Sequence, residues 1–144
     1  MSRDPTPPVS TPFLQVAALP WRRREGVLEV LLVTTRETRR WTVPKGWPIK
    51  GLSKRASAAL EADEEAGVTG TIGEKSIGRF TYWKRRTTRF DLVHVAVYPL
   101  EVTRQRKRWK EMTERRQMWA TPDDAAMAVE EPELATILRE FRGT

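Results

Sequence analysis

The chain has 144 residues, the usual length of one compact domain, and 39% of them are hydrophobic while 31% are charged. This composition excludes collagen-like and wholly disordered chains, and the lack of cysteine excludes disulfides, thiolate metal sites and cysteine nucleophiles. Lys and Arg total 26 against 19 acidic residues, and the resulting net charge of +7 favours a polyanionic partner: nucleic acid, a lipid surface or a small phosphate-rich molecule.

The first 12 residues are rich in Pro, Ser and Thr and contain no apolar run. They are expected to form a disordered leader and not a secretory signal, with one domain following over 13–144. No run of about 18 apolar residues occurs, so no membrane span is predicted and a cytoplasmic location fits best.

Short apolar runs predict strands in the first third of the chain, at residues 13–19, 28–35 and 41–43. Residues 22–26 form a polar turn between the first two, and residues 44–51 hold two prolines and two glycines, which predicts a loop. A helix is expected over 54–66, because this stretch is dense in Ala, Leu, Glu and Lys, Ser53 can cap its start and Gly67 suits its end.

The rest of the chain mixes strands and helical turns. Aromatic and β-branched residues predict a hairpin of strands 78–83 and 90–100 around a basic tip at 84–89. A second basic loop at 104–110, a short extended piece at 118–120 and two helical turns that begin with proline at 122–129 and 132–141 follow. Interleaved strands and helices indicate the α/β class, with a mixed sheet covered by helices.

Three glutamates stand three and four residues apart on the predicted helix: Glu61, Glu64 and Glu65. This spacing puts their carboxylates on one face, where like charges repel by a few tenths of a kcal/mol per pair. A divalent cation removes that repulsion, and Mg²⁺ prefers carboxylate oxygens while leaving coordination positions for substrate phosphate. Spacing alone favours the commoner alternative, a solvated acidic helix face.

The surroundings of this helix resemble the Nudix box, a loop-helix-loop motif written G-x5-E-x7-R-E-U-x-E-E-x-G-U, where U is aliphatic. Gly46, the three glutamates and Gly67 fall in register with it, and the segments at 41–46 and 119–125 also look like members of that family. The resemblance covers nearly the whole chain after the leader and identifies 13–144 as a Nudix hydrolase domain. It implies an α/β/α sandwich with a mixed central sheet, and hydrolysis of a phosphoanhydride.

The resemblance also implies a metal site. Glu61, Glu64 and Glu65 would hold Mg²⁺, or Mn²⁺ as the alternative, with the Gly46 carbonyl completing the set. Glu64 and Glu65 are the expected ligands, and Glu61 is a further ligand or the base that takes a proton from the attacking water. Two glutamates of the later loop, Glu111 and Glu114, are further candidates to approach the site.

Two positions depart from the motif. Leu52 stands where the family has Glu, and Leu60 stands where it has Arg. In the family these side chains are thought to support the loop and orient the helix. An apolar pair can replace a buried ion pair with little loss of stability, so we interpret the change as a structural swap that bears on catalytic rate.

The basic residues suggest the substrate class. The Trp-Pro-Ile-Lys-Gly segment after Gly46 and the basic hairpin are most similar to bacterial relatives of the diphosphoinositol polyphosphate phosphohydrolases. Side chains of Arg and Lys chelate phosphates through charge-assisted hydrogen bonds. The candidate substrate-binding residues are Arg36, Arg40, Lys45, Lys84, Arg85, Arg86 and Arg89, and their ordinary alternative is a role as solvated loop charges.

A dinucleoside polyphosphate or the triphosphate end of RNA fits the same basic surface, and RNA would need aromatic side chains that stack on bases. Trp83 and Trp109 meet that need only weakly, while Trp21, Trp41 and Trp119 are expected in packing roles and His94 in a structural one.

The sequence thus predicts a Mg²⁺-dependent pyrophosphohydrolase of a small polyphosphate. The alternatives are a nucleotide or RNA 5′-end pyrophosphohydrolase and a non-catalytic phosphate- or RNA-binding module. A pure polyanion binder has no use for a negative helix face, which favours the enzyme. Both a monomer and a homodimer stay open.

Overall fold

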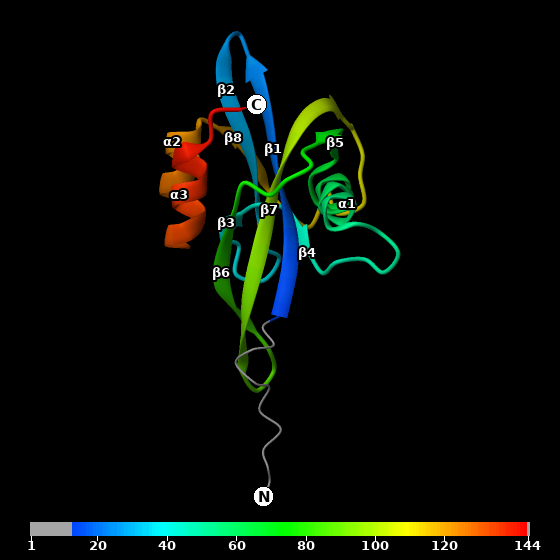
Figure 1. Ribbon diagram of the computed structural model, residues 1–144, viewed down its shortest axis with the longest axis vertical. Helices are drawn as coiled ribbons and strands as arrows, with labels where there is room; N and C mark the ends of the chain where they lie inside the picture. Colours follow the sequence, from blue (N-terminus) through cyan, green and yellow to red (C-terminus); the bar gives the residue numbers. More distant parts are fainter. Residues whose placement is uncertain (1–12, 144) are drawn as a thin grey trace, which may run out of the picture.

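The apolar runs of the sequence become the strands of one eight-stranded mixed sheet in the computed structural model, which describes residues 13–143 (Figure 1). The predicted leader at 1–12 lies outside the described residues, as does Thr144, so the division into leader and domain stays a prediction. The strands are β1 (Phe13–Arg24), β2 (Val27–Thr34), β3 (Trp41–Thr42), β4 (Lys45–Gly46), β5 (Val68–Ile72), β6 (Gly78–Arg85), β7 (Phe90–Gln105) and β8 (Gln117–Ala120).

Two long strands form the centre of the sheet. β1 pairs with β7 in parallel over nine residue pairs, from Phe13–Val93 to Trp21–Glu101, and the other strand pairs of the sheet are antiparallel. The strand order along the main path is β3-β2-β1-β7-β5. In addition, β4 pairs with β1, β6 pairs with the N-terminal half of β7 (residues 90–97), and β8 pairs with β2. The parallel pairing brings residues 13–21 beside residues 93–101, which are far away in the sequence.

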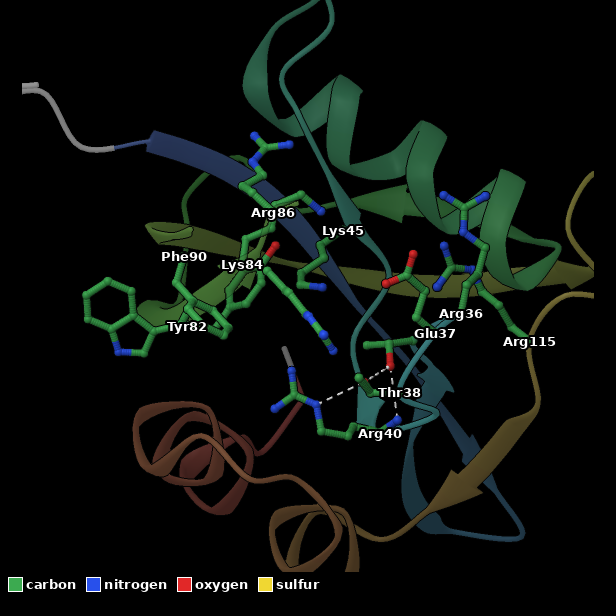
Figure 2. Close-up of a pocket in the computed structure, with 13 residues that line it drawn as sticks. Arg36, Glu37, Thr38, Arg40, Lys45, Tyr82, Lys84, Arg86, Phe90 and Arg115 are labelled. Atoms are coloured by element: carbon green, nitrogen blue, oxygen red, sulfur yellow. Dashed lines mark hydrogen bonds between the residues drawn. The ribbon is translucent and has the colours of Figure 1, made fainter. Parts of the chain in front are cut away.

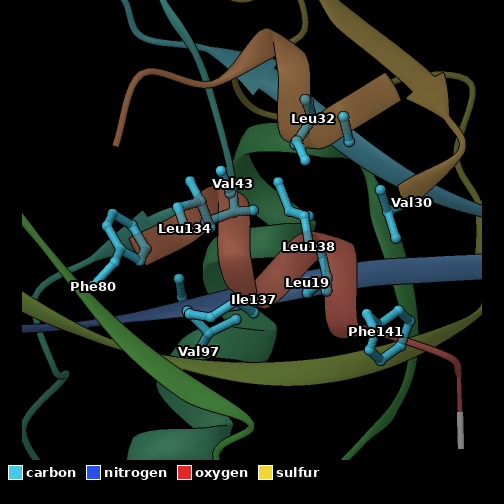
Figure 3. Close-up of a cluster of buried hydrophobic side chains, with 14 of the residues drawn as sticks. Leu19, Val30, Leu32, Val43, Phe80, Val97, Leu134, Ile137, Leu138 and Phe141 are labelled. Atoms are coloured by element: carbon cyan, nitrogen blue, oxygen red, sulfur yellow. The ribbon is translucent and has the colours of Figure 1, made fainter. Parts of the chain in front are cut away.

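Helices cover both faces of the sheet (Figure 1). α1 (Lys54–Ala66) lies on one face, and α2 (Pro122–Ala128) with α3 (Pro132–Glu140) lies on the other. The larger core lies beneath α2 and α3 and includes Phe80, Leu134 and Leu138 at 0% exposure (Figure 3). The smaller core lies beneath α1, where three fully buried alanines let the helix approach the sheet closely: Ala58, Ala62 and Ala66.

The ends of α1 follow from local chemistry. The Ser53 hydroxyl accepts a hydrogen bond from the Ala56 N–H at 3.1 Å, which satisfies one of the free donors of the first turn. Gly67 ends the helix in the left-handed conformation, with φ +70°, and its N–H reaches the carbonyls of Ala62 and Asp63. The predicted bounds of this helix are confirmed.

Several predictions about the strands were wrong in detail. β1 continues to Arg24, into the predicted turn at 22–26, and β6 continues to Arg85, into the predicted basic tip at 84–89. Lys45–Gly46 lies in the predicted loop but pairs with Val16 and Ala17 of β1. β5 was not predicted, because Val68–Ile72 contains a glycine and only two strongly apolar residues, and its pairing with distant β7 decides its conformation. β7 continues to Gln105, so the second basic loop begins later than expected. Within residues 13–143, no helix is long and apolar enough to cross a membrane.

Candidate active site

The acidic face of α1 lies against β4. The Glu61 carboxylate packs directly on Gly46, where an added Cβ atom would overlap it. Glu65 is only 5% exposed, and its Oε1 accepts a hydrogen bond from the Lys45 N–H at 3.3 Å. The tight approach of helix and strand therefore depends on glycine at position 46.

Glu61 and Glu65 share one electrostatic environment. Burial raises the pKa of Glu65. The charge of Arg115 lowers it, while a hydrogen bond and charge repulsion from Glu61 raise it further. Burial also raises the pKa of Glu61, and the neighbouring charges of Glu64 and Glu111 act in the same direction. Two facing carboxylates in a partly desolvated position favour either a shared proton or a bound cation.

The connection between β7 and β8, residues 106–116, folds over the end of α1. It places one basic side chain beside each of three acidic residues: Arg106 near Asp63 at 3.2 Å, Lys110 near Glu64 at 3.8 Å and Arg115 near Glu65 at 3.6 Å. We call this segment the clamp loop. Its backbone also donates to α1 and its C-cap, from Arg106 N–H to the Gly67 carbonyl at 2.8 Å and from Glu111 N–H to the Glu64 carbonyl at 3.0 Å.

The predicted metal ligands are close together but not yet convergent. Within residues 13–143, no three His, Asp or Glu side chains are grouped so that they could hold a metal ion as they stand. Glu61 and Glu65 face each other beside Gly46, whereas the Glu64 carboxylate lies near Lys110. Carboxylate oxygens are the ligands that Mg²⁺ and Mn²⁺ prefer, so these side chains are chemically suited to a divalent cation. A site built from all three glutamates requires the Glu64 side chain to rotate away from Lys110.

A basic cleft of about 640 Å³ opens beside β4 (Figure 2), and two of its lining residues, Lys45 and Arg115, contact Glu65. It lies between the β2–β3 connection, β4 and the β6–β7 hairpin, and one acidic residue, Glu37, lines it. The side chains of Lys45, Lys84 and Arg40 extend toward the same space in Figure 2. Seven cations line the cleft, namely Arg36, Arg40, Lys45, Lys84, Arg85, Arg86 and Arg115, so it suits a ligand with several negative charges.

Six of the seven predicted substrate-binding residues thus come together. The exception is Arg89, which is not among the cleft-lining residues and whose Nε donates to Asp91 at 2.9 Å. Four of the seven lining cations have acidic partners: Arg36 with Glu114, Arg40 with Glu130, Arg86 with Asp91, and Arg115 with Glu65 and Glu111.

Lys45 has a different environment, because its ammonium lies 4.6 Å from the centre of the Tyr82 ring. Burial lowers the pKa of Lys45 below its usual value, while Glu65 acts in the opposite direction. Burial likewise raises the pKa of Tyr82 to about 12, and its hydroxyl donates to Gln15 at 2.8 Å. The Tyr82 ring thus supports the lysine at the floor of the cleft.

The aromatic residues separate into packed and available ones. Trp83 and Phe90 line the cleft and are each 61% exposed, so both are free to contact a ligand. The Trp109 ring packs against Gly67 instead, which leaves it unsuited to stacking on a base. Trp21 is buried in the core, as predicted, while His94 lines a separate, smaller pocket and its structural role stays a prediction.

The two departures from the motif do not form a buried apolar pair. Leu52 is 44% exposed, and Leu60 is half-buried on α1. The interpretation as a buried swap was therefore wrong for Leu52. The cation nearest Glu65 comes from the clamp loop, as Arg115, and not from the helix itself. No local signal in the sequence distinguished this arginine from its basic neighbours, because its role depends on the pairing of β8 with β2.

No protein-family model matches the chain. Two proteins of Arabidopsis thaliana are similar in sequence. Nudix hydrolase 4 is 33% identical over 100 residues, covering 69% of this chain and 46% of the relative. Nudix hydrolase 21, chloroplastic, is 34% identical over 115 residues, covering 76% of this chain and 56% of the relative. The chain thus spans about half the length of these relatives.

Solved structures share the fold. The Ap4A hydrolase of C. elegans superposes with a TM-score of 0.65 at 22% identity, covering 90% of this chain and 95% of that one. The NUDIX domain of Shewanella oneidensis NrtR, solved with ADP ribose, gives 0.65 at 16% identity, with coverages of 88% and 84%. The MutT protein of Methanosarcina mazei Go1 gives 0.64 at 20% identity, with coverages of 92% and 94%. The predicted α/β/α sandwich with a mixed sheet is confirmed.

Proposed function

The chain belongs to the Nudix hydrolase superfamily, and from that premise we propose that it is a metal-dependent pyrophosphohydrolase of a small polyphosphate. One observation carries the proposal: a cleft lined by seven cations opens beside α1, whose Glu65 contacts two of the lining residues, Lys45 and Arg115. The six predicted cations of the cleft bind phosphate oxygens, and the carboxylates bind the metal and accept the proton.

Glu61, Glu64 and Glu65, with the Gly46 carbonyl, would hold Mg²⁺ or Mn²⁺. The bound ion supplies neutralisation of phosphoryl charge and activation of a coordinated water. The side chains of the protein bind the substrate and accept the proton. Lys45 and Lys84 hold phosphates in the cleft, and Glu61, whose pKa is raised by burial, is either a further metal ligand or the base that takes a proton from water.

Two substrate classes fit the cleft. Diphosphoinositol polyphosphates carry dense negative charge, which the seven lining cations match. Dinucleoside polyphosphates add two bases, and the exposed rings of Trp83 and Phe90 at the cleft favour this second class, since aromatic rings stack on bases. A nucleotide or RNA 5′-end pyrophosphohydrolase shares that chemistry. A cytoplasmic location and the choice between monomer and homodimer stay predictions.

The direct test is hydrolysis of a panel of diphosphoinositol, dinucleoside, nucleotide-sugar and 5′-triphosphorylated RNA substrates with Mg²⁺. We expect turnover by the wild type and a loss of about 10²-fold or more in kcat for Glu64→Gln and Glu65→Gln, the scale of losing a group that acts in the transition state. Glu74→Gln, at an exposed turn, is the matched control and should keep full activity. A wild type inactive on every substrate would leave only a non-catalytic binding module.

Trp83→Ala separates the substrate classes. If a base stacks on Trp83, its removal costs about 1 to 3 kcal/mol of binding, so KM for a dinucleoside polyphosphate should rise about tenfold. The KM for a diphosphoinositol substrate should stay unchanged, because that substrate has no aromatic ring. An equal effect on both substrates would argue against stacking.

A further inference from the structure

Arg115 makes contacts that set it apart from the other cations of the cleft. Its Nε donates to Glu111 Oε1 at 2.7 Å, its Nη2 lies 3.6 Å from Glu65 Oε2, and its Nη1 donates to the Thr34 carbonyl at 3.0 Å. One guanidinium therefore joins α1, the end of β2 and the clamp loop.

Arg115 and its two acidic partners are all largely buried. The side chain of Arg115 is 11% exposed, that of Glu65 5% and that of Glu111 14%. A buried charge that loses its partner is left without compensation, which costs far more than breaking a surface pair. The Arg36–Glu114 pair, at 60% and 45% exposure, lies at the opposite extreme.

The Glu65 carboxylate is consequently held from two sides. Oε1 accepts from the Lys45 N–H of β4, and Oε2 faces Arg115. Rotation of the carboxylate would break one or both contacts. The three nitrogens of Arg115 each face a protein oxygen, so this arginine is less available for phosphate than Lys45 or Lys84.

We propose that Arg115 is a positioning residue, which fixes the carboxylates of Glu65 and Glu111 at the edge of the cleft and does not itself bind the substrate. The proposal rests on the proposed function, because positioning matters for the hydrolysis only if these carboxylates act in it. It assigns the clamp loop a task that the sequence motif leaves open, since the helix carries Leu60 where the family has an arginine.

The direction in which Mn²⁺ affinity changes when Arg115 is replaced tests the proposal, and this measurement needs no hydrolysis. Coulomb's law alone predicts that Arg115→Ala tightens Mn²⁺ binding, because a positive charge leaves the neighbourhood of Glu65. Loss of positioning predicts the opposite, since disordered carboxylates bind a metal less well. We expect the Kd for Mn²⁺ to rise at least threefold in Arg115→Ala, measured from the electron paramagnetic resonance signal of the free ion.

Arg115→Lys keeps the charge, but its single nitrogen cannot reach all three oxygens that the three guanidinium nitrogens of Arg115 face, so a weaker Mn²⁺ affinity in this variant excludes a charge effect. It also serves if Arg115→Ala fails to fold, which a thermal melt reveals. Arg116→Ala removes the exposed neighbouring arginine and should leave the Kd unchanged. An unchanged or tighter Kd in both Arg115 variants would overturn the proposal.

Steady-state kinetics give the second readout. With any substrate that the wild type turns over, we expect Arg115→Ala to lower kcat at least tenfold and to leave KM within about threefold. A rise in KM alone would mean that Arg115 binds substrate, and would also overturn the proposal. A wild type that turns over nothing, with the Mn²⁺ result as expected, would defeat the proposed function and leave the positioning of these carboxylates standing.

Discussion

At the scale of single residues, two glycines show opposite reasons for lacking a side chain. A Cβ atom at Gly46 would overlap the Glu61 carboxylate, although the backbone there is unstrained. Gly26, in the β1–β2 turn, has φ +81° and no atom within 4 Å of an added Cβ. The first glycine makes room for a functional group, and the second permits a left-handed backbone.

The same substitution should therefore have different effects at the two positions. Gly46→Ala displaces the flexible end of Glu61, so we expect kcat to fall about tenfold, equivalent to about 1.4 kcal/mol, with little change in melting temperature. Gly26→Ala should cost about 1 to 2 kcal/mol of stability and leave kcat intact. Hydrolysis rates and thermal melts of both variants check this. Equal loss of activity in both would show that Gly46 has no specific role.

Asp91 gives a prediction for pH. Hydrogen bonds from Arg86 and Arg89 hold the pKa of this carboxyl below its usual value. Because the pKa is lower in the folded state than in the unfolded one, the carboxylate adds stability above about pH 4, and this contribution is lost as the pH falls through the folded-state pKa. Asp91→Asn should thus melt at a lower temperature than the wild type at pH 7. The gap should narrow below pH 4; a gap that stayed constant would contradict the ion-pair explanation.

At the scale of elements, α1 could be predicted to the residue and the strands around it could not. The helix carries its own signals: Ser53 at its start, Gly67 at its end and good helix formers between. The conformation of β4 and β5 depends on partners far along the chain, β1 and β7. Local patterns do not report such pairings, because strand propensity mainly reflects packing on neighbouring strands.

The clamp loop is held on α1 by Trp109, whose ring packs against Gly67. Trp109→Ala should cost about 2 to 3 kcal/mol, somewhat less than a fully buried tryptophan, and should free the loop for cleavage by trypsin at its many basic residues. Thr113→Ala, at an exposed position of the same loop, keeps every trypsin site; it is the control and should change neither the melting temperature nor the cleavage rate. Unchanged trypsin resistance in Trp109→Ala would mean that the backbone contacts and the ion pairs hold the loop without the Trp109 ring.

At the scale of the whole molecule, the sequence indicates which residue types form the cleft better than it indicates how they are assembled. Six of the cations predicted from charge line the cleft, while the role of the three glutamates as metal ligands stays a prediction. The mutual arrangement of the cations was not predicted, because Arg36, Lys45 and Lys84 come from three segments that only the folded sheet brings together. Arg115 was missed for the same reason, since its contacts to α1 and β2 exist only after β8 pairs with β2.

The net charge of +7 and the basic cleft act together on a polyanionic substrate. At low salt the field of the protein extends about 30 Å into the solvent, whereas at 0.1 M it is screened within about 10 Å. We expect KM for a polyphosphate to rise roughly tenfold when the salt concentration rises from about 0.01 M to 0.2 M, with kcat nearly constant. Initial rates measured over that range of salt concentrations give the salt dependence of KM.

The double variant Lys84→Gln, Arg85→Gln isolates the contribution of the cleft. It removes two lining cations that have no acidic partner among the ion pairs of residues 13–143. If attraction comes mainly from the cleft, this variant should show a clearly shallower salt dependence of KM. Lys107→Gln, Arg108→Gln removes the same charge from exposed positions of the clamp loop and should keep most of the wild-type slope. Equal slopes for the two double variants would mean that the total charge, and not its placement at the cleft, attracts the substrate.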